Sequence, residues 1–191
     1  MERSLIITLT AAHVVFRLLY LFYIGGVLRK RTRQGRDQTQ LSDWLQFKER
    51  ASFILHLDVD FFLAVTVLTS CWGGSDCLLN GLLVPDAVWS GLGAVMLLVG
   101  GYAKWDAYRI VGDRGWFWYN FFCAPEQTDY EVEGVYKWFD NPMYGVGYLT
   151  LLGFALLMLS SWGLVLAFFD WAVIWIFYYF CERPHTEQVL K

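Results

Sequence analysis

The chain has 191 residues, of which 57% are hydrophobic and 19% aromatic, and its formal net charge is −3. Its apolar residues form long unbroken blocks instead of the alternating faces of a soluble domain, which is typical of helical membrane proteins. The composition therefore excludes an ordinary soluble enzyme, and we expect the bilayer as a partner and no nucleic acid. A homo-oligomer is compatible with the sequence, which does not demand one.

The apolar blocks predict an all-α, polytopic membrane bundle of about five helices, forming a single transmembrane domain over residues 1–191. The first three helices are expected at about residues 4–28, 51–72 and 84–103. A fourth apolar block runs from 144 to 181, nearly twice the roughly 20 residues that cross a membrane.

Two serines and a glycine interrupt this last block near its middle, at Ser160, Ser161 and Gly163. Such residues break an apolar pattern and favour a turn. We therefore predict that the last two helices form a tight hairpin, 144–159 and 162–181.

The positively charged residues predict how the chain is oriented in the membrane. The segment 29–50 is expected to be a basic cytoplasmic loop, because it holds nearly half of the chain's 15 lysines and arginines, whereas 73–85 holds none. The segment 104–143 and the C-terminal tail then lie on the same, cytoplasmic side. This predicts an integral membrane protein with its active site facing the cytoplasm, in the endoplasmic reticulum or the bacterial inner membrane.

The four cysteines predict neither a disulfide scaffold nor a metal site. Cys71 and Cys77 could pair if their compartment is oxidising. Cys123 and Cys181 have no partner at a suitable spacing, and no cysteines or histidines lie at zinc spacings. We expect no bound metal.

Several ionisable residues interrupt the predicted helices, where charge is costly. In two helices such residues recur four positions apart, as His13 with Arg17 and His56 with Asp60, whereas Asp58 lies on another face. One interpretation is structural pairing, for example of Arg17 with Asp58 or Asp60. The other is a polar cavity for a headgroup or cofactor, in which His56 and Asp60 contact the substrate.

The segment 104–143 combines seven acids with a dense aromatic stretch, WFWYNFF, at 116–122. Because tryptophan and tyrosine prefer the boundary between membrane and water, we predict that this segment lies along the cytoplasmic interface. The same rings could instead stack on an adenine or surround a cationic sulfonium or ammonium group.

Two motifs at the two ends of the predicted hairpin carry a resemblance. The first is Asn141-Pro142-Met143-Tyr144, and the second is Cys181-Glu182-Arg183-Pro184-His185-Thr186. With GLGAVMLL at 91–98, they make residues 85–188 resemble the phospholipid methyltransferase family, most closely its phosphatidylethanolamine N-methyltransferase branch. The wider superfamily includes the isoprenylcysteine carboxyl methyltransferases. In this chain Arg183 stands where the family has a second glutamate.

The resemblance implies transfer of a methyl group from S-adenosylmethionine to a membrane lipid, phosphatidylethanolamine. It implies catalytic roles for Glu182, Asn141 and Tyr144, with His56 and Asp60 as further candidate bases. The expected cofactor contacts are Gly91, Gly93, Gly100, Gly101, Asn141, Pro142, Tyr144, Glu182 and Arg183. Gly91 and Gly93 fall in the outer half of their helix, far from a cytoplasmic cofactor, so Gly100 and Gly101 are the alternative. Helix packing would explain the glycines equally well.

Two rival functions remain at this point. A methyltransferase of the same family could act on another hydrophobic acceptor, such as a prenylcysteine carboxylate. A transporter or structural membrane protein could use the Asn141-Pro142 turn merely to begin a helix. Against a transporter, the sequence has no inverted repeat.

Overall fold

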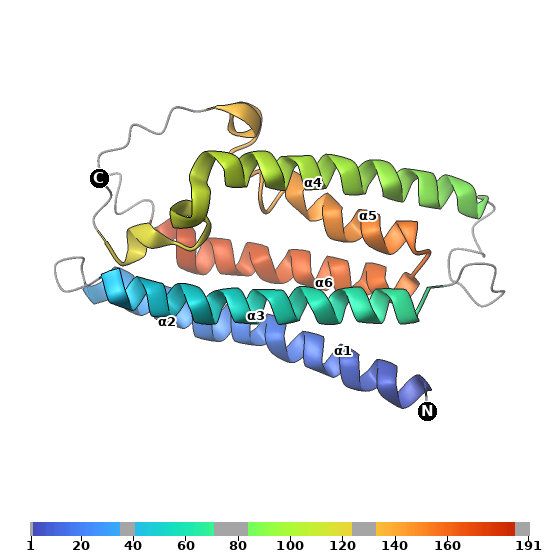
Figure 1. The fold of residues 1–191 in the computed structure, drawn as a ribbon, viewed down its shortest axis with the longest axis horizontal. Coiled ribbons are helices and arrows are strands. Elements are labelled where there is room, and N and C mark those ends of the chain that lie inside the picture. The colour runs from blue at the N-terminus through green and yellow to red at the C-terminus, as the bar shows by residue number, and fades with distance from the viewer. Residues whose placement is uncertain (1, 35–40, 71–83, 124–132, 186–191) are drawn as a thin grey trace.

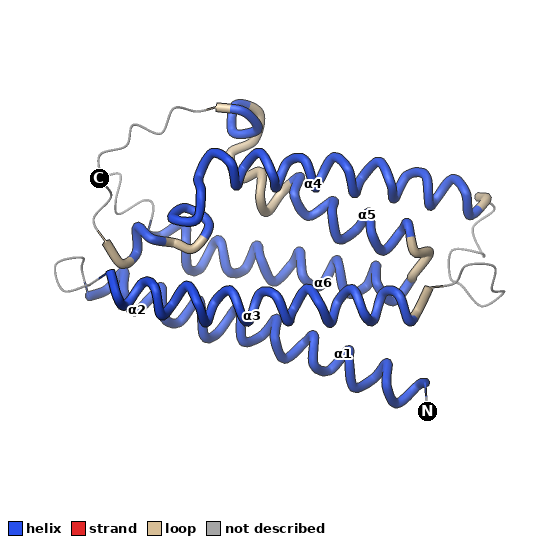
Figure 2. The backbone as a smooth tube through the Cα atoms, viewed as in Figure 1, coloured by secondary structure: helices blue, strands red, loops and turns tan. Residues whose placement is uncertain are grey.

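The computed structural model describes residues 2–34, 41–70, 84–123 and 133–185, which form a bundle of nearly parallel and antiparallel helices (Figure 1). Its principal helices are α1 (Glu2–Leu19), α2 (Gly25–Gln34), α3 (Leu41–Leu68), α4 (Asp86–Trp116), α5 (Leu149–Leu157) and α6 (Ser161–Phe177). The backbone view shows helices and short connections throughout the described residues (Figure 2). The all-α prediction is confirmed.

Helix α6 lies between two pairs of helices, α4 with α5 on one side and α1 with α3 on the other (Figure 1). Four helices, Arg3–Arg33, Leu41–Leu68, Asp86–Phe121 and Ser161–His185, are long and apolar enough to cross a membrane. Many of their large apolar side chains are exposed, as expected where lipid replaces water as the solvent.

The fourth predicted helix, 144–159, is shorter in the structure than the sequence suggested. The hairpin itself is present, and the Ser160 hydroxyl caps α6 by accepting a hydrogen bond from the Gly163 amide. However, α5 covers only the nine residues Leu149–Leu157, so it is much shorter than the 31-residue α4 that it packs against (Figure 1). The predicted span 144–159 is therefore wrong at its start, because residues 142–148 form a turn and a short 3-10 helix before α5 begins.

The basic residues after the first apolar block continue the helix instead of forming a loop. Helix α2 extends to Gln34 and α3 begins at Leu41, so most of the segment 29–50 is helical. We call this end of the bundle, where α2 ends and α3 begins, the basic end.

Two five-residue π-helical turns interrupt the helices on the way to the basic end. The first, η1 (Tyr20–Ile24), joins α1 to α2, and the second, η6 (Tyr178–Glu182), extends α6. Single π turns inside helices are frequent at functional sites because they re-aim side chains. Here they carry Tyr20 and Glu182.

The aromatic stretch 116–122 turns back into the bundle instead of lying along its surface. Helix α4 kinks at Gly112, whose φ of 59° suits glycine, and Trp118 has a left-handed φ of 53°. Phe117, Trp118, Phe121 and Phe122 are buried, and the Phe117 carbonyl accepts a hydrogen bond of 2.9 Å from the Trp44 indole. The prediction of an interfacial anchor is therefore wrong for these four rings, which fill the core at the basic end.

The Asn141-Pro142 turn is held tightly by its own backbone. The Gly145 amide donates to the Asn141 carbonyl at 3.0 Å, and the Gly147 amide donates to the Pro142 carbonyl at 2.8 Å. Both carbonyls are thus paired within the turn. The indole of Trp171 also donates to the Tyr144 carbonyl at 2.9 Å, which attaches the turn to α6.

Glycines allow α4 and α5 to approach one another closely. A Cβ on Gly93 would lie 2.7 Å from the Gly153 carbonyl oxygen, and a Cβ on Gly100 would lie 2.8 Å from the Thr150 hydroxyl. Small residues at such crossings are a common feature of membrane helix packing. Gly91 and Gly101, in contrast, have nothing within 4 Å of an added Cβ.

Gly93→Ala is accordingly expected to destabilise the protein by about 1–3 kcal/mol, because α5 has to move away from α4. Gly91→Ala is the matched control, in the same helix and with open space, and should be neutral or slightly stabilising because alanine favours helix. Thermal unfolding in detergent micelles measures both. Equal midpoints for the two variants would contradict the packing interpretation.

Candidate active site

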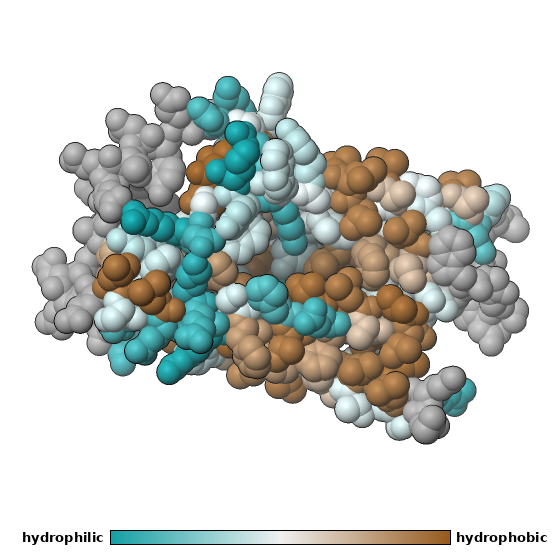
Figure 3. Space-filling view, viewed as in Figure 1, coloured by the Kyte–Doolittle hydropathy of each residue, from teal (hydrophilic) through white to brown (hydrophobic). Residues whose placement is uncertain are grey.

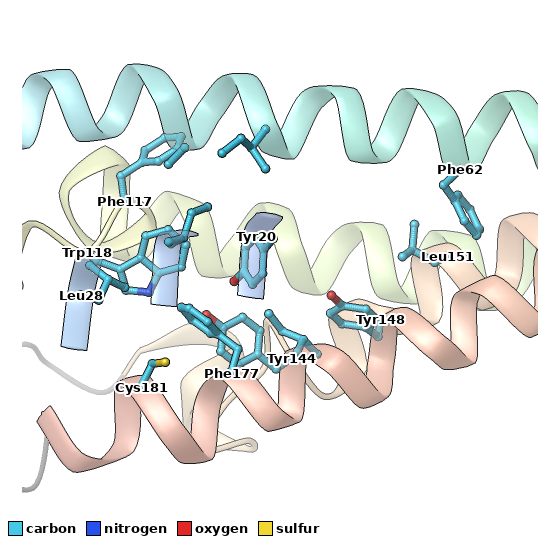
Figure 4. Close-up of a cluster of buried hydrophobic side chains, with 14 of the residues drawn as sticks. Tyr20, Leu28, Phe62, Phe117, Trp118, Tyr144, Tyr148, Leu151, Phe177 and Cys181 are labelled. Carbon is cyan, nitrogen blue, oxygen red and sulfur yellow. The ribbon is translucent and has the colours of Figure 1, made fainter. Parts of the chain in front are cut away.

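A cavity of about 110 Å³ lies inside the bundle near the basic end. Aromatic and ionisable side chains from α1, α4, α6 and the 141–148 turn surround it, several of which appear in Figure 4. The lining residues are Arg17, Tyr20, Leu55, Lys104, Gly115, Trp116, Trp118, Met143, Tyr144, Tyr148, Ile174 and Glu182.

The Glu182 carboxylate forms one end of the cavity. Its Oε1 accepts a hydrogen bond of 2.6 Å from the Tyr144 hydroxyl and another from the Trp118 indole. The π turn η6 positions Glu182, the Asn-Pro turn positions Tyr144, and the left-handed backbone of Trp118 directs its ring inward. Two donors on one oxygen are the arrangement expected around an ionised carboxylate.

Two phenols near this carboxylate resist ionisation. Burial raises the pKa of Tyr144 well above its ordinary value, and the charge of Glu182 raises that pKa further. Burial, and after it the same charge, raise the pKa of Tyr136 to about 12. Tyr144 therefore remains a hydrogen-bond donor to Glu182 at any physiological pH.

These shifts predict how stability depends on alkaline pH. In the unfolded chain Tyr136 ionises near its ordinary pKa of 10.0, whereas in the folded protein it keeps its proton up to about 12. Because the folded state then holds more protons, stability should fall as pH rises between these values and be unaffected below 10.0. Thermal unfolding at several alkaline pH values should show a smaller loss in Tyr136→Phe than in the wild type. Identical losses would contradict the assignment.

The other end of the cavity is positively charged. The Tyr148 hydroxyl accepts a hydrogen bond of 3.3 Å from Arg17, and the Lys104 ammonium lies 5.2 Å from the centre of the Tyr148 ring. Figure 4 shows Tyr148 on the far side of Tyr144 from Trp118. The charge of the cavity thus changes sign along its length.

A buried ionic cluster holds Arg17 in place. Its guanidinium lies 2.5 Å from Asp58 Oδ2 and 2.8 Å from Asp170 Oδ1. His13 completes the cluster, with Nδ1 3.2 Å from Asp58 Oδ1 and Nε2 3.1 Å from Asp170 Oδ1. All four residues are at most 3% exposed. The predicted pairing of Arg17 with Asp58 is present, and Asp170, far away in the sequence, joins it.

Three members of this cluster, His13, Asp58 and Asp170, place possible metal-ligand atoms within 4.8 Å of one another, which the sequence did not lead us to expect. The Arg17 guanidinium contacts both carboxylates of this group. The charge of the acids is therefore already balanced by the chain itself.

Of the predicted substrate contacts, neither lies at the cavity. His56 and Asp60 are exposed on the outer face of α3, and His56 Nδ1 lies 2.6 Å from the Ser52 carbonyl oxygen of its own helix. Asp58, on the inward face, is the acid that enters the bundle. Neither His56 nor Asp60 lines this cavity, so their role as substrate contacts stays a prediction.

The predicted cofactor contacts divide into two groups. Tyr144 and Glu182 line the cavity, and Asn141 and Pro142 build the turn that positions Tyr144. The other contacts lie away from the cavity. Two of the glycines, Gly91 and Gly101, face open space, and two, Gly93 and Gly100, are covered by α5. Arg183 is exposed, with its guanidinium 5.8 Å from the Tyr179 ring centre. Helix packing explains Gly93 and Gly100, which leaves their role as cofactor contacts a prediction without support from this geometry.

Sequence reasoning missed Tyr20, Lys104 and Tyr148 as cavity residues, whereas Trp118 belongs to the aromatic stretch that it offered as an alternative ligand contact. Lys104 had a usable signal, because it is an isolated cation one turn after the small residues Gly100 and Gly101 in an apolar helix. Cys123 and Cys181 are free thiols. Cys71, Cys77 and Thr186 lie outside the described residues.

Comparison with known proteins identifies the relatives of this chain. The family model described as phospholipid methyltransferase matches residues 88–191, which is more than half of the chain. The chain belongs to the phospholipid methyltransferase family. It is an integral membrane protein, as its apolar helices and this family indicate.

Several curated relatives of this family member carry one name, phosphatidylethanolamine N-methyltransferase. The protein of Meyerozyma guilliermondii is 34% identical over 169 residues, which cover 87% of this chain and 19% of the relative. The protein of Neosartorya fischeri is 30% identical over 149 residues, covering 78% of this chain and 15% of the relative. The protein of Lodderomyces elongisporus is 28% identical over 166 residues, which cover 83% of this chain and 18% of the relative. The chain thus spans less than a fifth of the length of these relatives. No solved structure matches it.

Proposed function

We propose that this chain methylates the amine of phosphatidylethanolamine, with S-adenosylmethionine as the methyl donor. The observation that carries the proposal is the 2.6 Å hydrogen bond between Tyr144 and Glu182. It joins the two motifs of the family resemblance at one end of a cavity inside a membrane bundle. The name shared by the curated relatives supports the same reaction.

The charge of Glu182 favours an amine acceptor over a carboxylate acceptor. A carboxylate at the end of the cavity attracts an ammonium group and repels the carboxylate of a prenylcysteine. An ammonium also has to lose a proton before its nitrogen can attack, and Glu182 is positioned to accept it. Among the described residues, Glu182 is the only acid that lines the cavity.

The remaining residues orient Glu182 and exclude water. Tyr144 and Trp118 fix its carboxylate by donating to Oε1, and Tyr144 keeps its proton because its pKa is raised. Asn141 shapes the turn, since its side-chain oxygen accepts the Tyr144 amide at 3.4 Å. Such positioning and electrostatic effects are what an enzyme contributes to a displacement reaction.

The residues at the Glu182 end of the cavity fit the positively charged, reactive part of S-adenosylmethionine by their chemistry. When bound, this donor supplies an electrophilic methyl group on a positively charged sulfur. The Tyr20 and Trp118 rings offer faces for a cation or an adenine, and Glu182 offers a negative charge. Outside this lining, the buried Tyr136 hydroxyl has no hydrogen-bond partner among the described residues.

The basic end is proposed to face the cytoplasm, where a soluble methyl donor is available. The cluster of arginines and lysines at this end supports the orientation through the positive-inside rule. The endoplasmic reticulum and the bacterial inner membrane are the two membranes that fit this arrangement. The methyltransferase core is proposed to extend over residues 85–188.

The test is to incubate the purified protein with radiolabelled S-adenosylmethionine and a total lipid extract, and then to identify the labelled product. Labelled N-methylated phosphatidylethanolamine is expected, and its mass gives the number of methyl groups added. Label in a prenylcysteine methyl ester would contradict phosphatidylethanolamine as the acceptor, but it would still support methyl transfer from S-adenosylmethionine. If the protein fails to bind the donor even at high concentration, it is not a methyltransferase.

A further inference from the structure

Lys104 is a cation without an ion-pair partner among the residues that the structure describes. No carboxylate of residues 2–34, 41–70, 84–123 or 133–185 lies within ion-pair distance of its ammonium, which sits beside the Tyr148 ring. Its stem packs against Gly147, where a Cβ would lie 2.9 Å from Lys104 Cγ. The turn of the first family motif therefore leaves room for this side chain and directs it into the cavity.

The ionic cluster behind Lys104 does not neutralise it. Both ring nitrogens of His13 face oxygen acceptors, the Asp58 carbonyl at 3.0 Å and the Asp170 carboxylate at 3.1 Å, so both are satisfied only as N–H donors. His13 and Arg17 then carry two positive charges against the two acids. The cluster is balanced, which leaves Lys104 positive at one end of the cavity and Glu182 negative at the other.

This arrangement of one negative and one positive end complements a zwitterion whose two charges lie in the matching order along the cavity. A phosphoethanolamine headgroup has a positive amine and a negative phosphate joined by two carbons. Lipids of the cytoplasmic leaflet point the amine toward water and the acyl chains toward the membrane centre. The cavity has the same order, with Glu182 nearer the basic end and Lys104 deeper.

The cavity also has the size and the opening that a headgroup requires. Its volume of about 110 Å³ is well below the 300–1,000 Å³ that larger ligands occupy, so it suits a small group. Half-buried Leu55 of α3 and Lys104 of α4 both reach its wall. Figure 3 shows the surface hollowed between these two helices, where acyl chains can remain in the membrane.

We propose that Lys104 binds the phosphate of the phospholipid acceptor, with Arg17 and Tyr148 behind it, and so places the amine at Glu182. The inference rests on the proposed function and assigns a binding role that no motif of the family resemblance contains. The anionic group that Lys104 recognises has two possible sources, the lipid phosphate and the carboxylate of the methyl donor. The experiment therefore uses one probe for each source.

Binding is measured on the full chain in detergent micelles by equilibrium dialysis, with two radiolabelled probes. Dihexanoyl-phosphatidylethanolamine supplies the phosphate, and S-adenosylhomocysteine supplies the carboxylate of the donor. Lys104→Gln should lower the affinity for the lipid probe roughly tenfold or more, as expected when a charged hydrogen bond is lost. It should change the affinity for S-adenosylhomocysteine by less than about twofold. Lys104→Arg should recover most of the lipid affinity. Lys48→Gln, which removes a cation outside the cavity, is the matched control.

A third probe, an ether of ethanolamine and dihexanoylglycerol without phosphate, isolates the contact. It should bind the wild type and Lys104→Gln equally, because the group that Lys104 holds is missing. The proposal is overturned if Lys104→Gln weakens the binding of S-adenosylhomocysteine alone, weakens the binding of both radiolabelled probes equally, or weakens the binding of neither. A wild type that binds neither probe would instead contradict the proposed function, so the two failures are distinguishable.

Discussion

Glu182→Gln is expected to lower methylation of phosphatidylethanolamine by about a hundredfold or more, the range for removing a catalytic acid or base. Glutamine keeps the size of the side chain and an oxygen that can accept from Tyr144 and Trp118. It removes the charge that attracts the ammonium group and the base that accepts its proton. The fold should survive, and initial rates with labelled donor measure the loss.

Two further variants sharpen this result. Asn141→Ala should also fold and lose activity, because Tyr144 loses the turn that directs it toward Glu182. Glu49→Gln makes the same chemical change at an exposed position of α3 and should leave the rate unchanged. Full activity in both Glu182→Gln and Asn141→Ala would remove Glu182 from the mechanism.

Asp170→Asn is expected to destabilise the protein by about 3–5 kcal/mol, because it leaves buried positive charge without compensation. The Asp170 Oδ1 atom faces both Arg17, at 2.8 Å, and His13, at 3.1 Å. Thermal unfolding in micelles should show a large drop of the midpoint. Asp60→Asn, an acid on the exposed face of α3, is the control and should change little.

A charge-balanced double variant distinguishes electrostatics from packing. Arg17→Leu with Asp170→Leu removes one charge of each sign and leaves His13 beside Asp58. It should therefore be more stable than Asp170→Asn alone, since replacing a buried ion pair by apolar groups is often neutral. A double variant that is less stable than the single variant would show that shape, not charge balance, dominates at this cluster.

The sequence predicted much of the fold because lipid imposes a simple rule on composition. Long apolar blocks have to be helices, since a membrane leaves no partner for unpaired backbone groups. The hairpin, the Asn141-Pro142 turn and the approach of Glu182 to Tyr144 follow from such blocks together with the family resemblance. What failed was the length of α5, because the same apolar pattern suits a lipid-exposed helix and turns buried in protein.

The partners of the charged residues could not be predicted for a different reason. A spacing of four shows that His56 and Asp60 share a face, but not that this face points away from the bundle. Nor does local pattern connect His13 with Asp170, which lie 157 residues apart. Trp118 is directed inward by a left-handed backbone conformation, which the sequence does not indicate because the residue is not a glycine or an asparagine.

The π turn η1 sets the rotational phase of the first transmembrane segment. Tyr20, Ile24, Leu28 and Thr32 recur at every fourth residue and all face the interior. In a regular α-helix each such step rotates the side chain by about 40°, so Thr32 would point roughly a third of a turn away from Tyr20. The wider turn absorbs that drift. Deleting one residue within 20–24 would leave eleven regular steps of about 100° between Tyr20 and Thr32, close to three full turns, so Arg17 and His13 would still face Asp58 and Asp170. The π turn is therefore a local widening of the helix around Tyr20 that keeps the two halves of this segment in phase.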